Sequence, residues 1–173
     1  MFPRSHRGFT LIELLVAMTI AILLLVLAMP GYTLWVADSQ IKNAAESIAS
    51  GLRYAQTTAI SRNANAQFVL NGGGWDVMLV DDPTVSIQTA SFLEGSRDVT
   101  VVGVDATPAA ATTVAFNALG QVLPNATNLV QIDVTMPSMA TSRPLRVLVG
   151  NGRTGVKLCN PSMPAADPQG CPP

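Results

Sequence analysis

The chain has 173 residues, which is enough for one domain with an extension. Apolar residues make up 49% of it and charged residues only 12%, a composition too apolar for an ordinary soluble domain. The net charge of −1 and the isoelectric point near 5.7 argue against a wholly basic domain that coats nucleic acid.

The first predicted element is an apolar segment over residues 9–29, which reads FTLIELLVAMTIAILLLVLAM with Glu13 as its single charge. As a helix it would span about 30 Å, the thickness of a bilayer's hydrocarbon core, and it therefore predicts a transmembrane helix. Arg4 and Arg7 precede it and no Lys or Arg follows before Lys42, so the positive-inside rule puts the N-terminus in the cytoplasm. A cleaved secretory signal is the alternative, but no Ala-x-Ala site follows the segment, so we predict that it is retained.

A second helical pattern follows the apolar segment. Pro30 and Gly31 are expected to kink or loosen the helix between the two patterns. Beyond them, apolar residues recur at spacings of three and four, which predicts one helical face that packs on a soluble domain. We therefore predict one long helix over residues 9–63, with a membrane or filament-core part at 9–30 and an amphipathic part at 31–63. The predicted face consists of Ile41, Ala45, Ile48, Leu52, Ala55 and Ala59.

Short β-like runs separated by turn signals occupy the rest of the chain, residues 64–173. The sequence Asn71-Gly72-Gly73-Gly74 between the first two runs predicts a hairpin. The predicted fold class is α+β: a long N-terminal helix packed on an antiparallel β domain of two sheets. The candidate strands are 67–70, 75–80, 86–92, 99–104, 113–116, 129–135, 144–149 and 156–159.

The two cysteines, Cys159 and Cys171, lie on the predicted exported side of the membrane. An even number of cysteines in an oxidising compartment favours a disulfide, which would tether the irregular Pro- and Ala-rich tail that begins at Asn160. A metal site is the alternative, but it needs more ligands, and the only histidine is His6 on the cytoplasmic side. We predict no metal and no cofactor.

The charges of the predicted head are distributed unevenly. Residues 67–133 hold seven acids and one base, whereas four bases near the C-terminus stand against Asp167 alone. These bases are candidates for contacts with DNA phosphates, or for solvated strand edges that discourage unwanted pairing. No nucleophile–base pair is evident and Asp81-Asp82-Pro83 reads as a turn, so we predict that the chain is not an enzyme. The four bases are Arg143, Arg146, Arg153 and Lys157.

The sharpest motif is Gly8-Phe9-Thr10-Leu11-Ile12-Glu13, which resembles the type IV prepilin signature. The resemblance implies a leader at residues 1–8, which a prepilin peptidase removes between Gly8 and Phe9, and N-methylation of Phe9. It also implies that Glu13 pairs with the charged N-terminus of a neighbouring subunit during assembly. Pro30 matches the family pattern as well.

A looser motif resembles the head of H-type pseudopilins and of FimT/FimU minor pilins. It consists of 114–117 leading to Gly120, 145–149 and 155–159, and the terminal cysteine pair fits FimT/FimU better than the secretion-system version. The family's DNA-binding Gly-Arg-x-Arg stretch is broken here, because Gly155 stands in place of its first arginine.

This resemblance implies a minor pilin of a type IV pilus that takes part in initiating assembly, at the tip. The alternatives are a DNA-binding minor pilin for natural transformation and the H-type minor pseudopilin of a type II secretion system. The implied location is the inner membrane with a periplasmic head, then the pilus. The implied partners are other minor and major pilins, the inner-membrane assembly machinery, the prepilin peptidase, and membrane lipid before assembly. The DNA-binding alternative adds double-stranded DNA to these partners.

Overall fold

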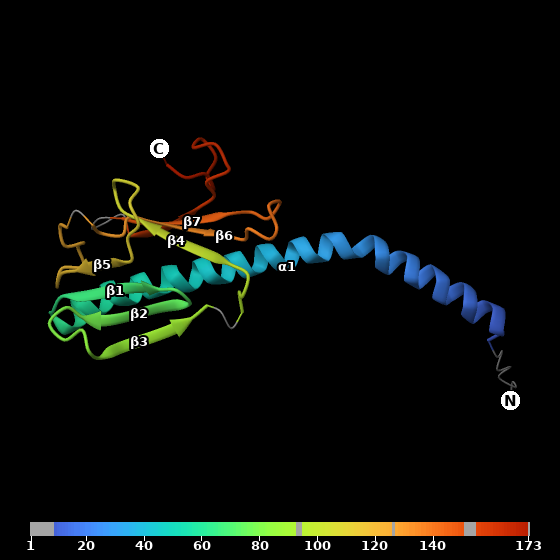
Figure 1. The fold of residues 1–173 in the computed structure, drawn as a ribbon, viewed down its shortest axis with the longest axis horizontal. Helices are drawn as coiled ribbons and strands as arrows, with labels where there is room; N and C mark the ends of the chain where they lie inside the picture. The colour runs from blue at the N-terminus through green and yellow to red at the C-terminus, as the bar shows by residue number, and fades with distance from the viewer. Residues whose placement is uncertain (1–8, 93–94, 126, 151–154, 173) are drawn as a thin grey trace, which may run out of the picture. The chain divides into compact units, whose positions relative to one another are not determined.

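The computed structural model describes residues 9–92, 95–125, 127–150 and 155–172. The described part contains one helix followed by eight strands (Figure 1), and the chain divides into two compact units, Met1–Val36 and Ala37–Pro173. The elements are α1 (Leu11–Arg62), β1 (Ala66–Asn71), β2 (Gly74–Leu79), β3 (Ser86–Ser91), β4 (Thr100–Val104), β5 (Thr113–Phe116), β6 (Gln131–Thr135), β7 (Leu145–Val149) and β8 (Val156–Cys159).

The part of α1 that lies in the first unit is apolar and exposed. Its described residues are exposed as far as Trp35, and the helix continues through Pro30 without a break in its assignment. It is the one helix in the described chain long and apolar enough to cross a membrane, judged by length and composition. The predicted helix over 9–63 is therefore confirmed to within two residues at either end.

The rest of α1 belongs to the second unit and buries one face. All six residues of the predicted face are fully buried, with no exposed surface. The same face also buries Ala37, Ala44 and Ala49, and it includes Gly51, so most of its side chains are small. Small side chains allow the helix axis to approach the sheets closely, and Gly51 lies directly against the ring of Trp75.

Two antiparallel sheets of four strands make up the rest of the second unit, which confirms the α+β prediction. Their strand orders are β3-β2-β1-β5 and β4-β6-β7-β8. All eight predicted strands are present, each with its bounds shifted by no more than two residues. Gly72 and Gly73 form the predicted hairpin, because Asn71 pairs with Gly74 at its base.

One hydrophobic core joins α1 to both sheets, and all its members lie at or after Ala37. At its centre Phe68 of β1 and Trp75 of β2 stack with ring centroids 5.9 Å apart. The indole nitrogen of Trp75 donates a hydrogen bond to the hydroxyl of Ser47 on α1, at 3.1 Å. This contact ties the helix to the first sheet.

The loop after β4 is held by a buried carboxylate, that of Asp105, which is 8% exposed. It accepts hydrogen bonds from the hydroxyl and the backbone N–H of Thr107, both at 2.7 Å, and from the N–H of Ala109 at 3.0 Å. The Thr107 hydroxyl, followed by the backbone N–H groups, lowers the pKa of Asp105 below its usual value, although desolvation acts in the opposite direction.

Candidate functional site

The first candidate site is the start of α1. Phe9 is 84% exposed ahead of the helix, and Gly8 lies outside the described residues. The hydroxyl of Thr10 accepts a hydrogen bond from the backbone N–H of Glu13 at 3.3 Å. Thr10 is thus the N-cap of α1, and Glu13 occupies the third helical position, where the helix dipole stabilises a carboxylate. Sequence analysis missed this role, although Thr-x-x-Glu before an apolar run is the spacing of a capping box.

Glu13 is the one acid on an otherwise apolar helical surface. Among the described residues, none of the ion pairs includes its carboxylate. Leu11, Ile12 and Leu14 beside it are all more than half exposed. This end of the helix therefore presents a carboxylate and a wide apolar surface together, an arrangement that suits a cationic group on an apolar neighbour.

Pro30 lies within α1, where it removes one backbone donor and leaves the carbonyl of Val26 without its usual partner. The carbonyl of Pro30 itself accepts a hydrogen bond from the Thr33 hydroxyl at 3.0 Å. Tyr32 and Trp35 follow, with ring centroids 6.2 Å apart.

The cysteines form the predicted disulfide. Cys159 ends β8 and is bonded to Cys171, and their Cα atoms are 4.9 Å apart. The backbone N–H of Asn160 donates to the carbonyl of Gln169 at 2.7 Å, so the tail returns alongside the end of β8. No three His, Cys, Asp or Glu side chains that could hold a metal ion come together in the described chain.

The structure describes three of the four candidate DNA contacts, Arg143, Arg146 and Lys157. Arg146 on β7 is paired with Asp133, the residue opposite it on β6: Nε lies 2.6 Å from Oδ1 and Nη2 lies 3.2 Å from Oδ2. Such a two-pronged pair neutralises the guanidinium and holds it in place. Arg146 is therefore occupied within the head, which the sequence could not indicate without the register of the two strands.

Lys157 lies diagonally from Arg146 across the β7–β8 pair, whereas Arg143 lies near α1. Arg143 approaches Asp38 on α1, with its backbone N–H 2.8 Å from Oδ1 and its Nε 3.9 Å from Oδ2. Lys157 is exposed on β8, and the carbonyl of its neighbour Val156 accepts a hydrogen bond from Arg53 on α1 at 3.4 Å. Residues 38 and 53 are about 22 Å apart along a helix, so the bases next to them are separated as well. Arg153 lies outside the described residues.

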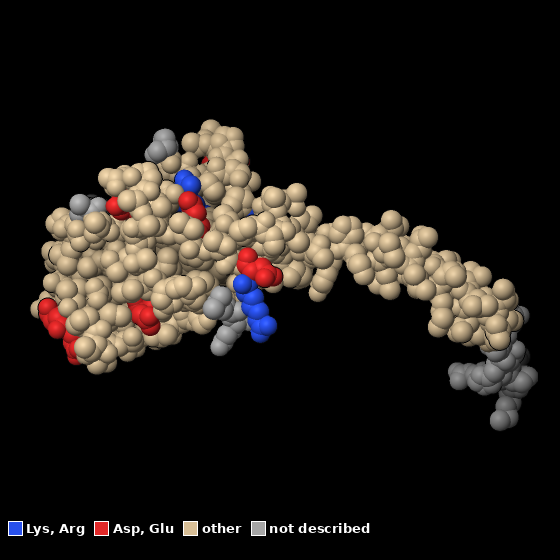
Figure 2. All heavy atoms as spheres, in the orientation of Figure 1, with Lys and Arg blue, Asp and Glu red and all other residues tan. Residues whose placement is uncertain are grey.

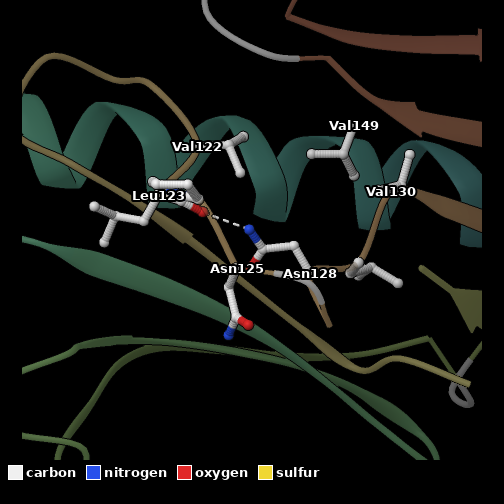
Figure 3. Close-up of a pocket in the computed structure, with 8 residues that line it drawn as sticks. Val122, Leu123, Asn125, Asn128, Val130 and Val149 are labelled. Atoms are coloured by element: carbon white, nitrogen blue, oxygen red, sulfur yellow. Dashed lines mark hydrogen bonds between the residues drawn. The ribbon is translucent and has the colours of Figure 1, made fainter. Parts of the chain in front are cut away.

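A shallow hollow of about 300 Å³ opens beside the segment that joins β5 to β6 (Figure 3). It is lined by Val122, Leu123, Asn125, Asn128, Val130 and Val149, with Pro124 and Leu129. The Asn128 amide donates a hydrogen bond to the Leu123 carbonyl across it. None of the lining side chains ionises, so the hollow offers no acid, base or nucleophile.

Comparisons with known proteins identify the family of this chain. The profile described as "Type II transport protein GspH" matches residues 44–153, and the profile "Prokaryotic N-terminal methylation motif" matches residues 3–29. The chain belongs to the GspH family. Members of this family are structural pilin or pseudopilin subunits rather than enzymes, and they work in assemblies with other pilins.

Solved structures share the fold of this GspH-family chain. The type IV minor pilin FimU of Pseudomonas aeruginosa is 15% identical with a TM-score of 0.50, covering 75% of this chain and 98% of that one. The minor pseudopilin EpsH from the type 2 secretion system of Vibrio cholerae is 13% identical with a TM-score of 0.52, covering 72% of this chain and 99% of that one. No match was found among curated protein sequences.

Proposed function

We propose that this chain is a minor pilin of a type IV pilus, a structural subunit that takes part in starting assembly at the pilus tip. The observation that carries the proposal is the start of α1, where a capped helix presents Glu13 on an exposed apolar surface. The methylation motif over residues 3–29 supports it. The disulfide that tethers the tail favours a pilus subunit over a secretion pseudopilin, because the sequence resemblance associates a terminal cysteine pair with FimT/FimU minor pilins.

Processing would prepare the helix for assembly. A prepilin peptidase would cut between Gly8 and Phe9 and methylate Phe9, so that a new cationic N-terminus stands one helical turn before Glu13. An acid within an apolar span costs about 2.5–3.5 kcal/mol on insertion scales. Pairing Glu13 with the N-terminus of a neighbouring subunit would offset that cost and fix the axial position of one subunit against the next.

The apolar half of α1 would first hold the subunit in the inner membrane, with the N-terminus in the cytoplasm and the head in the periplasm. In the filament the same surface would pack against the helices of other minor and major pilins. Exchanging lipid for apolar helices changes the hydrophobic free energy little, so the assembly machinery can extract the subunit at modest cost.

The test is a deletion of the gene in its native host, with surface pili and secreted proteins both counted. The proposal expects pili to be lost and secretion to continue, and it expects wild-type chain to restore pili where a Glu13→Gln chain does not. The opposite result, in which secretion fails and pili remain, would establish the H-type pseudopilin alternative that the likeness to EpsH also supports.

DNA binding is the second candidate, and it rests on two exposed bases. The Arg143 side chain is 76% exposed, and Lys157 belongs to none of the ion pairs in the described chain. Binding of double-stranded DNA to head 37–173 at low salt should weaken as salt rises and should fall in a Lys157→Ala, Arg143→Ala variant. Arg146→Ala is the matched control, since Asp133 already neutralises that guanidinium and its removal should change binding less. Binding that is absent at low salt would exclude this function for the isolated head.

A further inference from the structure

Two aromatic side chains stand on the surface of α1 just after its apolar segment. Tyr32 and Trp35 are 65% and 66% exposed, and their ring centroids are 6.2 Å apart. Residues three apart share one face of a helix, so both rings lie on the same side of α1. Such rings suit surroundings that are apolar on one side and wet on the other, because the phenol hydroxyl and the indole N–H are polar and the rings are not.

This end of the apolar segment has no cationic side chain. The sequence holds no Lys or Arg between Arg7 and Lys42, and Lys42 is itself paired with Glu46 at 3.7 Å. The visible face of the apolar part of α1 likewise carries no charged side chain (Figure 2). Tyr32 and Trp35 are therefore the residues here whose chemistry matches a membrane interface, where tyrosine and tryptophan are enriched.

The separation of the aromatic pair from Glu13 matches the thickness of a bilayer. Tyr32 follows Glu13 by 19 residues and Trp35 follows it by 22. At 1.5 Å per residue these separations are about 28 and 33 Å, and the hydrocarbon core is about 30 Å thick. Between them the polar side chain is that of Thr19, whose hydroxyl donates to the carbonyl of Val16 at 2.8 Å. When the rings lie at one boundary of the hydrocarbon, the Glu13 carboxylate therefore lies at the other.

Both ends of this segment then oppose a shift of the helix along its axis. An outward shift by one turn, about 5 Å, would move the rings into water and draw Glu13 towards the bilayer centre, where an acid costs about 2.5–3.5 kcal/mol. An inward shift would bury the polar groups of Tyr32 and Trp35 in hydrocarbon, which is also unfavourable. The helix accordingly has one preferred depth.

We propose that Tyr32 and Trp35 bind the phospholipid headgroup region of the periplasmic leaflet and so fix the depth of the subunit in the inner membrane. The proposal rests on the proposed function, which puts the apolar part of α1 in that membrane. Removal of the leader would take away Arg4 and Arg7, the cations that precede the segment on its cytoplasmic side. The processed subunit would then be anchored from the periplasmic side, the side towards which the assembly machinery extracts it.

Quenching of tryptophan fluorescence by brominated lipids measures the depth of the pair. The full chain is reconstituted into vesicles of phosphatidylethanolamine and phosphatidylglycerol, with bromine either near the headgroup or near the end of the acyl chain. Trp75 is 5% exposed inside the head, and a Trp35→Phe chain gives its contribution, which is subtracted. Bromine near the headgroup should quench Trp35 more strongly than bromine near the bilayer centre. Stronger quenching by the deep bromine, or quenching by an aqueous quencher alone, would overturn the proposal.

Single cysteines introduced over residues 26–36, outside the substituted positions, locate the membrane boundary. The described chain has no free cysteine, so an impermeant thiol reagent reports on the introduced ones. In a Tyr32→Leu, Trp35→Leu chain the first reactive position should move towards the head by about four residues, one helical turn, because leucine prefers the hydrocarbon. Leu34→Ala changes an exposed neighbour that is not aromatic, and this matched control should leave the boundary in place.

The outcomes separate this inference from the proposed function. Resistance to alkaline extraction tests membrane insertion by itself, and a chain released by that treatment would overturn both. An inserted double variant whose boundary does not move would overturn the depth-setting role alone. If that variant also lost pili, the aromatic pair would act in packing between subunits rather than at the lipid interface.

Discussion

The close contact between α1 and β2 allows one substitution to be predicted in detail. A Cβ atom built on Gly51 lies 2.6, 2.7 and 2.8 Å from three ring atoms of Trp75. Carbon atoms in ordinary contact are about 3.5–4.0 Å apart, so Gly51→Ala must displace the indole by about 1 Å. Trp75 cannot move freely, because it is 5% exposed, stacks on Phe68 and donates a hydrogen bond to Ser47.

The free energy of unfolding should fall by about 3 kcal/mol. Glycine to alanine within a helix normally gains about 1 kcal/mol. Against that gain, overpacking costs about 1–3 kcal/mol, the hydrogen bond to Ser47 contributes about 1 kcal/mol and the aromatic stack about 1 kcal/mol. For a head of this size the melting temperature should fall by about 12 °C.

Thermal and urea unfolding of head 37–173, followed by tryptophan fluorescence, measures the change. Ser50→Ala, an exposed neighbour on the same helix, is the matched control and should change stability by less than about 0.5 kcal/mol. In the Gly51→Ala, Trp75→Phe double variant the smaller ring leaves room for the methyl group. The stability lost by the double variant should therefore be smaller than the sum of the losses in the two single variants. A Gly51→Ala head that is more stable than wild type would refute the reasoning.

Three further predictions concern other parts of the chain. Hydrogen bonds from Thr107 lower the pKa of Asp105 below its ordinary value of 3.8, so the stability from this carboxylate is present above that value and is lost as pH falls through the lower folded one. Urea midpoints should therefore fall more steeply below pH 4 in wild type than in Asp105→Asn, and parallel curves would contradict this. Replacing Cys159 and Cys171 by serine should destabilise the head by about 2–3 kcal/mol, as expected for a short closed loop; a reductant should lower the wild-type melting temperature similarly and leave the double variant unchanged. Glu13→Gln chain should insert into the membrane as wild type does but fail to enter pili, and normal incorporation, measured by immunoblot of sheared filaments, would exclude the pairing role.

The spacing of apolar residues predicted most of the helix and strand positions, because burial of one face determines that spacing. The six residues spaced along 41–59 are all fully buried, and the strands follow the alternation that a half-buried sheet imposes. Strand order could not be predicted. β5 lies beside β1 and β4 beside β6, and neither pairing joins strands that are consecutive in the chain. Such pairings depend on packing across the whole core, which local sequence patterns do not contain.

The candidate sites were predicted unevenly for a related reason. The disulfide followed from counting cysteines, and the Thr10–Glu13 cap could have been read from four adjacent residues. The ion pair that neutralises Arg146 depends on the register between β6 and β7, which places Asp133 opposite it. The sequence of the connecting loop does not specify that register. The contact of Arg143 with Asp38 joins residues 105 positions apart, and no local signal predicts it.

The small side chains on the buried face of α1 have a consequence for divergence within the family. Where a helix lies close to a sheet, the contact constrains side-chain volume, and at Gly51 even one added methyl group meets the ring of Trp75. Substitutions that leave this volume unchanged are the ones that the contact permits. This chain and FimU are 15% identical and share the fold over 75% of this chain. For engineering, substitutions that enlarge a residue on the buried face of α1 are to be avoided, Gly51→Ala included.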